Sequence, residues 1–161
     1  MIVRTATADD VADIARVAER SWTVDYPDIL TRETAEAAVN EWYDADRIAE
    51  ELAAERTLLL VAEADGSVVG FAHATWNDAE GYILRTYVHP DHRGEGFGRG
   101  LLTETRDVLD SKGVERINAM VLADNDPGNA FYERFGFERV DQSETEVGGE
   151  SYRENRYVLE L

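Results

Sequence analysis

The sequence predicts a mixed α/β domain, with a central, mixed and mostly antiparallel sheet that carries helices on both faces. Apolar segments of strand length alternate with amphipathic segments of helical period. Some consecutive strands are joined by short turns such as Asp65–Ser67 and others by helices, so hairpins and crossovers share one sheet. No repeat or linker interrupts the 161 residues, so we expect one domain over residues 1–161 with its own hydrophobic core.

The N-terminal third is expected to form one strand followed by helices. Thr7 and Asp10 give a capping-box signal, with Asp where Glu or Gln is usual. Apolar residues then recur on one helical face, and Pro27 interrupts the pattern. The expected elements are a strand at Ile2–Thr5, a helix from Val11 to Trp22, a break at Trp22–Leu30 and helices at Arg32–Tyr43 and Asp46–Glu55.

A hairpin and a further strand are expected in the middle of the chain. The apolar run Leu58–Val61 is typical of a buried strand, and an Asp-Gly-Ser turn joins it to a second apolar run. The expected strands are Thr57–Ala64, Val68–Trp76 and Tyr82–His89, with a second turn at Asn77–Gly81.

The C-terminal part alternates helix and strand. Lys112-Gly113 ends the first helix, Pro127 lies in the first turn of the second, and Gly136 closes it. The expected order is a helix that opens in a glycine-rich loop after Pro90, a strand at Ile117–Leu122, a helix from Asp126 to Gly136, and strands at Phe137–Val140 and Tyr152–Leu161 around a polar loop at Asp141–Ser151.

The chain is strongly acidic, with 34 Asp and Glu against 16 Lys and Arg, a net charge of −18, and Lys112 as the one lysine. At molar salt the screening length falls to about 3 Å, so this self-repulsion is tolerable and the carboxylates keep the surface hydrated. We therefore expect a halophilic protein, with an acidic protein of ordinary cytoplasm as the alternative. The absence of a basic stripe argues against a nucleic-acid partner.

Other classes are excluded by what the sequence lacks. With no cysteine there is no disulfide, thiolate metal site or cysteine nucleophile, which removes transfer through a thiol intermediate. No apolar run approaches the roughly 20 residues of a membrane helix. Met1–Thr5 has no apolar stretch of the signal-peptide kind. We expect a cytoplasmic protein with no membrane partner and no metal.

One stretch, from Tyr87 to Leu102, carries the chemical signal. A strand ends at Pro90, and four glycines at alternate positions, 94, 96, 98 and 100, lead into a helix. Glycine lets the backbone approach an anion and adopt positive φ. The helix N-terminus adds unpaired N–H groups and a positive dipole end. The stretch therefore predicts a pyrophosphate site made of main-chain amides.

Two nucleotide motifs do not fit this stretch. A P-loop needs Gly-Lys-Ser/Thr, but Arg99 and Gly100 follow Gly98. The dinucleotide pattern G-x-G-x-x-G fails from Gly94, where its third glycine would be Arg99, and from Gly96, where it would be Leu101. A nucleotide-phosphate binder is therefore disfavoured.

The pattern that does fit is Arg93-x-x-Gly96-x-Gly98 after a strand that ends in V-x-P, and it closely resembles the acyl-CoA-binding motif of the GNAT superfamily of N-acetyltransferases. The segment from Asn125 to Phe137 resembles a second element of the superfamily, Asn-x-x-Ala-x-x-x-Tyr-x-x-x-Gly-Phe, with Gly128 where Ala is usual. The resemblance covers essentially the whole chain. It implies a GNAT fold with a V-shaped splay between the two central strands, and acetyl-CoA as co-substrate.

The resemblance also implies roles for individual residues. Tyr87 and Val88 would pair with the pantetheine arm like an added strand, and the Val88 amide would polarise the thioester carbonyl. Asn125 would bond the cofactor arm, and Tyr132 would give a proton to the departing thiolate. The amides expected at the pyrophosphate are those of Arg93, Gly94, Glu95, Gly96, Phe97, Gly98 and Arg99.

The general base stays open, although an amine must lose a proton before it can attack. In ribosomal-protein alanine acetyltransferases a Glu five residues before the motif Asn serves, but Met120 stands there, which argues against that subfamily. Glu80 is the nearest carboxylate to where other members place a base. His73 and ordered water are the alternatives.

We therefore expect an acyl-CoA-dependent N-acyltransferase that acetylates a primary amine, in a small molecule or peptide, by direct attack in a ternary complex. The alternatives are a non-catalytic acyl-CoA-sensing module, and decarboxylation or longer-chain acyl transfer on the same fold. Many superfamily members dimerise, and the resemblance extends the expectation of a homodimer to this chain. The superfamily shapes its acceptor pocket with the early helical region, which here holds Trp22, Tyr26, Trp42 and Tyr43.

Overall fold

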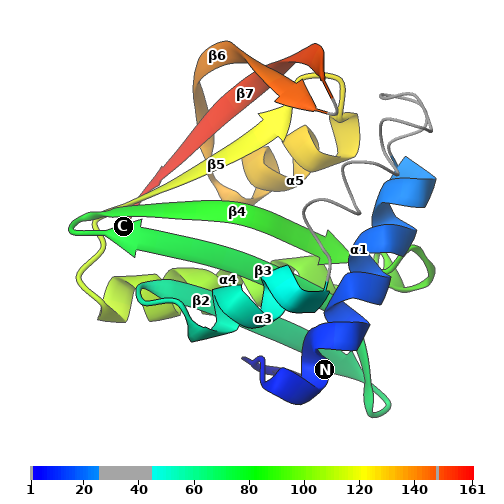
Figure 1. The fold of residues 1–161 in the computed structure, drawn as a ribbon. Coiled ribbons are helices and arrows are strands. Elements are labelled where there is room, and N and C mark those ends of the chain that lie inside the picture. The colour runs from blue at the N-terminus through cyan, green and yellow to red at the C-terminus, as the bar shows by residue number, and fades with distance from the viewer. Residues whose placement is uncertain (1, 26–44, 148) are drawn as a thin grey trace.

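A computed structural model describes residues 2–25, 45–147 and 149–161, and within these residues seven strands form one sheet (Figure 1). The strand order is β1-β2-β3-β4-β5-β7-β6. All neighbouring strands are antiparallel except β4 and β5, which run parallel. The strands are β1 (Ile2–Thr5), β2 (Thr57–Ala64), β3 (Ser67–Asn77), β4 (Glu80–Val88), β5 (Arg116–Leu122), β6 (Glu138–Val147) and β7 (Glu150–Glu160).

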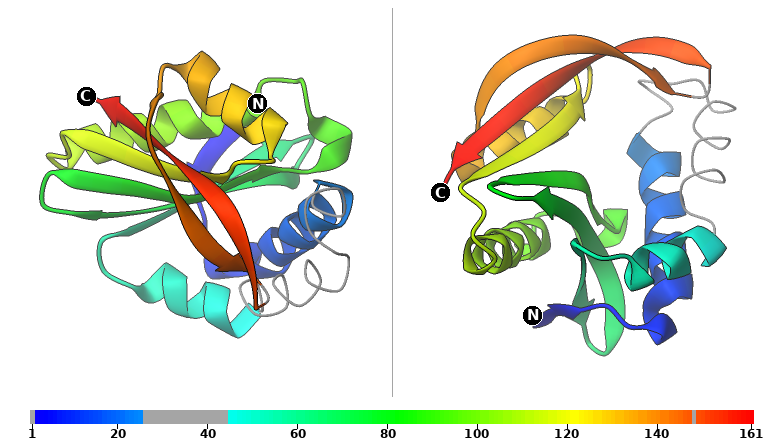
Figure 2. Two further views of the ribbon diagram at one scale, coloured as in Figure 1. Left: turned by 90° about the horizontal axis from the view of Figure 1, so that it is seen from above. Right: turned by 60° about the vertical axis from the view of Figure 1, so that its left-hand side comes forward.

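Helices cover both faces of this sheet, as the sequence predicts (Figure 2). Helices α1 and α3 pack on one face, whereas α4 and α5 pack on the other. The described helices are α1 (Val11–Asp25), α3 (Ala45–Ala53), α4 (Phe97–Ser111) and α5 (Asp126–Phe135), with short 3-10 turns η1 (Ala8–Asp10) and η2 (Pro90–His92).

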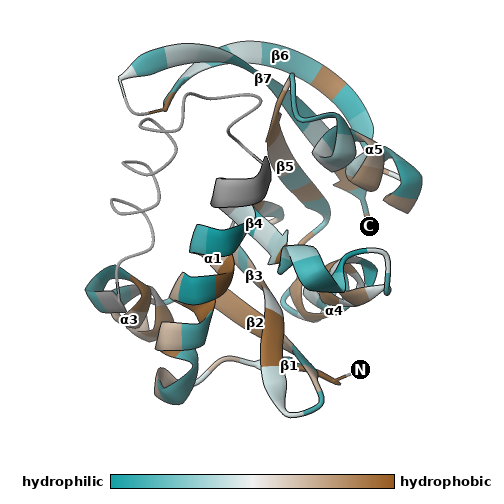
Figure 3. Cartoon of the chain, turned by 90° about the vertical axis from the view of Figure 1, so that its right-hand side faces the viewer, coloured by the Kyte–Doolittle hydropathy of each residue, from teal (hydrophilic) through white to brown (hydrophobic). Residues whose placement is uncertain are grey.

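The two helical layers explain why β2 is apolar on both sides. Leu58 and Leu60 belong to the core that contains α4, while Leu59 and Val61 belong to the core that contains α1. Successive side chains of a strand point to opposite faces, so a continuous apolar run is what a doubly covered strand needs. Hydropathy follows the same division, since β2 and β3 are largely hydrophobic and the β6–β7 ribbon is mainly hydrophilic (Figure 3).

The central sheet splays open between β4 and β5. The two strands pair only where Glu80–Ile83 meets Arg116–Ala119. Beyond that point β4 stays with β3, and β5 follows β7 away from it (right-hand view of Figure 2). The predicted V-shaped splay is therefore confirmed. One edge of β4 from Leu84 to Val88 is left without a partner strand among the described residues.

The predicted loop at Asp141–Ser151 is wrong, because most of it is paired strand. β6 continues to Val147 and β7 begins at Glu150, with Thr145 opposite Tyr152. Gly149 turns between them at a φ of 84°. The side chains of β6 are almost all exposed, so the hairpin rests on main-chain pairing and leaves no apolar pattern in the sequence.

The predicted break at Trp22–Leu30 begins too early, since α1 runs on to Asp25. The rest of that break and the predicted helix Arg32–Tyr43 lie outside the described residues, as do Tyr26, Trp42 and Tyr43. The side chain of Trp22 also lies outside the described part.

Asp10 fixes the start of the first helical segment. Arg4 Nη1 donates to Asp10 Oδ2 at 2.8 Å and Arg4 Nη2 to Asp10 Oδ1 at 2.9 Å. The Thr7 amide donates to the same carboxylate at 2.8 Å, and Arg4 reaches Glu63 of β2 at 2.7 Å. The hydrogen bonds from Arg4 lower the pKa of the buried Asp10 carboxyl below its ordinary value of 3.8.

We predict that Asp10→Asn lowers the free energy of unfolding by about 1.5–3 kcal/mol at pH 7, because a charge-assisted pair is lost. The folded-state pKa of Asp10 is lowered, so its contribution is complete above the unfolded pKa and disappears as the pH falls through the folded pKa. Urea unfolding of both proteins at pH 7 and in acid measures the difference, which should shrink in acid. The exposed Asp9→Asn is the control, and a difference that does not change with pH would contradict the prediction.

Candidate active site

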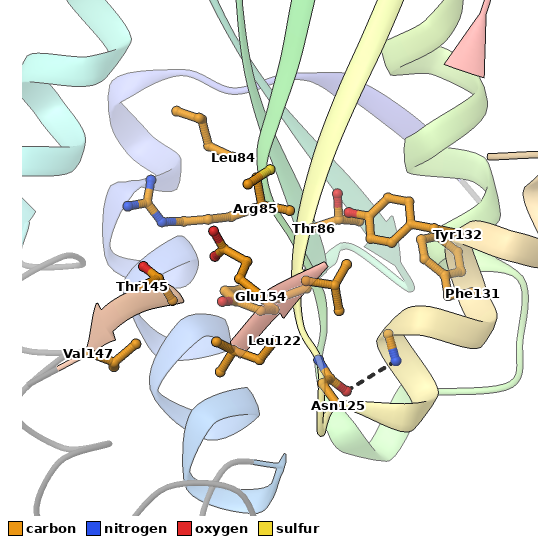
Figure 4. A pocket seen from close by; sticks show the side chains of 14 residues that line it. Leu84, Arg85, Thr86, Leu122, Asn125, Phe131, Tyr132, Thr145, Val147 and Glu154 are labelled. Carbon is orange, nitrogen blue, oxygen red and sulfur yellow. Dashed lines mark hydrogen bonds between the residues drawn. The ribbon is translucent and has the colours of Figure 1, made fainter. Parts of the chain in front are cut away.

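The splay between β4 and β5 opens a cavity of about 240 Å³ (Figure 4). Residues 84–87 of β4 and 120–122 of β5 form two of its walls. Asn125 and Tyr132 contribute from α5 and its cap, while Thr145 and Glu154 contribute from the β6–β7 ribbon. The sequence-predicted residues Tyr87, Asn125 and Tyr132 thus share one cavity.

The main chain of Val88 faces this opening. His89 donates its amide hydrogen to Val69 of β3 at 2.7 Å, so the alternation of an antiparallel ladder turns the N–H and C=O of Val88 away from β3. The Val88 carbonyl accepts hydrogen bonds from Ser21 Oγ at 3.3 Å and from Arg93 Nε at 3.2 Å. The side chain of Arg93 therefore ties the glycine-rich loop to the end of β4.

The loop after β4, where the sequence predicts an anion site, contains main-chain N–H groups that can act as donors. Gly94 and Gly96 adopt φ of 77° and 89°, and Gly96 is the N-cap of α4. Among the described residues, no acceptor is recorded for the amides of residues 94–99. Some of these amides belong to the loop. The others belong to the first turn of α4, whose N–H groups have no partner within the helix and lie at the positive end of the helix dipole.

Close packing brings this donor loop to the cavity. A Cβ built on Gly98 would lie 3.3 Å from the Phe131 ring and 3.7 Å from a Val88 methyl. Phe131 lines the cavity, so the absence of a side chain at Gly98 lets α4 begin beside it. Gly98 at the start of α4, Val88 at the end of β4 and Phe131 of α5 therefore adjoin one another.

Asn125 caps α5, because its Oδ1 accepts the Gly128 amide hydrogen at 3.1 Å (dashed line in Figure 4). Its side chain folds so closely over the helix that a Cβ on Gly128 would lie 2.6 Å from Asn125 Nδ2. The departure from Ala at this position thus has a local steric reason. Next to it, Asn129 links α5 to β7 by accepting from Asn155 at 2.8 Å and Tyr157 at 2.6 Å.

Tyr132 lies in an aromatic cluster at the floor of the cavity. Its ring centroid is 5.2 Å from those of Phe131 and Phe137 and 6.0 Å from that of Tyr157. Burial raises the pKa of its phenol to about 12, an effect partly offset by the facing Thr86 hydroxyl (Figure 4). The Thr86 oxygen makes no well-aligned hydrogen bond within the described residues. At neutral pH Tyr132 is therefore protonated and can donate.

Glu80 is not brought to this cavity. Its carboxylate accepts from Asn118 Nδ2 at 2.8 Å and pairs with Arg116 at 3.3 Å, at the opposite end of β4 from Val88. His73 does not line the cavity either; it is buried in β3 opposite Arg85, and desolvation lowers its pKa to about 4. Both candidate bases are therefore engaged elsewhere in the sheet.

Two charged residues that the sequence did not single out do line the cavity, Arg85 of β4 and Glu154 of β7 (Figure 4). The Arg85 guanidinium lies 3.3 Å from His73 Nδ1. Glu154 is half-buried, and burial raises the pKa of its carboxyl. Among 34 acidic residues nothing in the sequence distinguishes Glu154, since its place depends on the β6–β7 hairpin that the sequence did not predict.

Two other features bear on class. Within the described residues, no group of three His, Asp or Glu side chains is arranged to hold a metal ion. None of the described helices is both long and apolar enough to span a membrane.

A sheet that parts between two parallel strands, with a main-chain donor loop beside the parting and a buried phenol within it, is the arrangement expected of an acyl-CoA-dependent acyltransferase. Residues 12–137 match the acetyltransferase (GNAT) family. The chain therefore belongs to the GNAT family, and it is an N-acetyltransferase that uses acetyl-CoA.

Individual relatives agree with this assignment. A spermidine N(1)-acetyltransferase from Thermoplasma acidophilum is 27% identical over 143 residues, or 86% of this chain and 89% of the relative. An acetyltransferase from Sodalis glossinidius is 31% identical over 118 residues, or 73% of this chain and 83% of the relative. The crystal structure of the PaiA N-acetyltransferase from T. acidophilum in complex with coenzyme A has a TM-score of 0.84 at 26% identity and covers 97% of this chain and 98% of its own.

Gly96→Val is expected to weaken acetyl-CoA binding at least tenfold. Gly96 has a left-handed backbone conformation, which costs a β-branched residue about 1–2 kcal/mol, so the loop should change its conformation and its amides their direction. The matched control is Gly66→Val in the β2–β3 turn, where φ is 82° and nothing lies within 4 Å. Calorimetric titration with acetyl-CoA and urea unfolding compare the two variants. If Gly96→Val and Gly66→Val lose similar stability and also lose acetyl-CoA affinity equally, a donor role for the loop is contradicted.

Gly128→Ala restores the residue usual in the superfamily, yet we expect it to weaken acetyl-CoA binding several-fold, because the new methyl displaces the Asn125 side chain. A double-mutant cycle isolates the cause: acetyl-CoA is titrated calorimetrically into the wild type, Gly128→Ala, Asn125→Ala and the double variant. If the added methyl acts through Asn125, the double variant should bind no more weakly than Asn125→Ala alone. Additive losses would show that the methyl acts by another route.

Proposed function

We propose that residues 1–161 form a single acetyltransferase domain that acetylates a primary amine by direct attack within a ternary complex. The observation that carries the proposal is that three kinds of donor lie in or beside the splay: the Val88 N–H that is turned away from β3, the loop amides next to Gly98, which packs against Phe131, and the Tyr132 phenol that lines the cavity. A chain without cysteine cannot hold the acetyl group on a thiol of its own, which is consistent with direct attack of the amine on the thioester.

The cofactor would lie along the splayed edge of β4. The pantetheine arm pairs with Tyr87 and Val88 as an added strand, and Asn125 bonds the arm from the β5 side. The amides of Arg93 to Arg99 hold the pyrophosphate, helped by the dipole of α4. The Val88 N–H then polarises the thioester carbonyl and stabilises the oxyanion that forms on attack.

Tyr132 would protonate the leaving thiolate. Its phenol keeps its proton well above neutral pH, since burial raises its pKa to about 12. A thiolate of ordinary basicity is a better leaving group when it takes a proton as the C–S bond breaks. Of the two candidate bases from the sequence, Glu80 and His73, neither faces this opening, so we do not assign either a role.

The acceptor would be a cationic amine. An acidic residue, Glu154, lines the cavity, and the net charge of −18 attracts cations. The similarity to a spermidine N(1)-acetyltransferase supports a polyamine within this class, and peptide amines are the other members to test. The acidic composition supports a halophilic protein, which is tested by activity from 0 to 3 M KCl, roughly the range in which screening becomes complete. The superfamily resemblance supports a homodimer, which is tested by light scattering.

The function is tested by a panel of amines with acetyl-CoA in molar KCl, with free thiol as the readout. We expect thiol release with at least one aliphatic amine. Acetyl-CoA binding without thiol release from any amine would favour the sensing module instead. Faster thiol release from longer acyl-CoA substrates than from acetyl-CoA would favour transfer of a longer acyl chain instead.

Tyr132→Phe is expected to lower kcat by about 10²–10⁴-fold, with little change in acetyl-CoA affinity, because it removes only the proton donor. The ring remains, so the aromatic cluster is preserved. Tyr152→Phe is the control, since its hydroxyl bonds Glu150 at 2.6 Å outside the cavity. Unchanged turnover in Tyr132→Phe would remove the residue from this role.

A further inference from the structure

Glu154 is placed at the centre of the ribbon that faces the splay. It lies opposite Leu122 of β5 and Ser143 of β6, so its side chain shares a face with Thr145, another cavity residue. Among the described residues that line the cavity, Glu154 is the one carboxylate. Figure 4 shows it between the β6–β7 ribbon and Arg85, on the open side of β4.

Within the described part of the chain, this carboxylate has no counter-charge of its own. Neither a hydrogen bond nor an ion pair to the Glu154 side chain is recorded there. The other titratable groups at the cavity are Arg85 and Tyr87 of β4 and Tyr132 of α5. Arg156, on the same face of β7, donates instead to Asn118 Oδ1 at 3.1 Å. A half-buried carboxylate is stabilised by an opposite charge close to it, and a cationic ligand in the cavity would supply such a charge.

Apolar side chains share the cavity with Glu154. Leu84 and Met120 line the cavity and are 45% and 41% exposed, an unusual surface position for large apolar side chains. Leu122 and Val147 complete this lining. A carboxylate next to an apolar channel suits an ammonium group on a chain of methylenes.

We propose that Glu154 binds the ammonium group of an aminoalkyl acceptor and is the general base that removes its proton. The proposal rests on the proposed function and deepens it. The burial that raises the pKa of Glu154 makes its carboxylate a stronger base than an exposed one, which supports the assignment.

With these roles, Glu154 and Tyr132 account for every proton that is transferred in the reaction. Glu154 takes one proton from R–NH3⁺, and the neutral amine forms the C–N bond to the thioester carbonyl. As the C–S bond breaks, the sulfur takes the phenol proton of Tyr132, and the phenolate recovers a proton from the new amide nitrogen. Glu154 releases its proton to solvent. The products are the N-acetyl amine, CoA-SH and one H⁺.

The test compares Glu154→Gln with Glu144→Gln, using spermidine and the best amine of the panel as probes. Glu144 is exposed on β6 opposite Arg153, so it shares the ribbon but faces away from the cavity. For Glu154→Gln we expect kcat/KM at pH 7 to fall by about 10²–10⁴-fold. The deficit should narrow as the pH approaches the amine pKa of about 10.4, where solvent delivers neutral amine. Glu144→Gln should match the wild type, and Glu154→Asp should restore part of the rate.

Three outcomes overturn the proposal: a wild-type rate in Glu154→Gln, a deficit that is constant with pH, or an equal loss in Glu144→Gln. Acetyl-CoA affinity should be unchanged in Glu154→Gln, which separates a base from a folding defect. Binding of spermidine to the CoA complex at pH 7, by calorimetry, is a second readout that does not need turnover. Equal spermidine affinity in the wild type and in Glu154→Gln overturns the ammonium site. If the wild type binds acetyl-CoA but acetylates no amine, the proposed function itself is overturned.

Discussion

The parting of β4 from β5 is the constraint on which the site depends. Pairing holds only over Glu80–Ile83, and beyond it β4 has an edge of main-chain donors and acceptors that no described strand satisfies. Such an edge is costly unless solvent or a ligand pairs with it. An extended amide-bearing arm, such as that of coenzyme A, has the right chemistry to complete the ladder.

Polar contacts hold both ends of the opening. At its closed end Asn118 bridges β5 to β4 by donating to Glu80 at 2.8 Å and to the Gly81 carbonyl at 3.1 Å. At its open end Asn129 ties α5 to β7, which carries β5 away from β4. Phe131 and Tyr132, which lie between, are thereby held at the floor of the cavity. The same contacts explain why Glu80 belongs to the framework of the sheet.

Anion binding in so acidic a chain needs donors that do not depend on lysine. In the proposed function main-chain amides at the start of α4 would supply them, and the glycines let the loop bend without side chains that would cover these amides. In the proposed function the acidic surface would attract a cationic acceptor, while main-chain N–H groups and the helix dipole would hold the cofactor phosphates. The two ligands would thus be recognised by different kinds of group.

The sequence by itself determined the local elements and the glycine-rich loop before α4, because both depend on short-range patterns. Strand-length apolar runs such as Leu58–Val61, Pro127 and Gly136 at the ends of α5, and the alternating glycines before α4 need no distant partner to be recognised. They place Tyr87, Asn125 and Tyr132 on the elements that meet at the opening. The sequence predicted a strand at each end of the exposed β6–β7 hairpin but not the paired part within Asp141–Ser151, since main-chain pairing leaves no apolar pattern.

Tertiary structure alone decided which charged residues meet. Glu80 and Glu154 are equivalent in a sequence with 34 acidic residues, yet one pairs with Arg116 and Asn118 while the other lines the cavity. That difference is set by strand register, in which Glu80 faces Arg116 and Glu154 faces Leu122. Register between distant segments depends on the packing of the whole sheet, so no local pattern could have specified it.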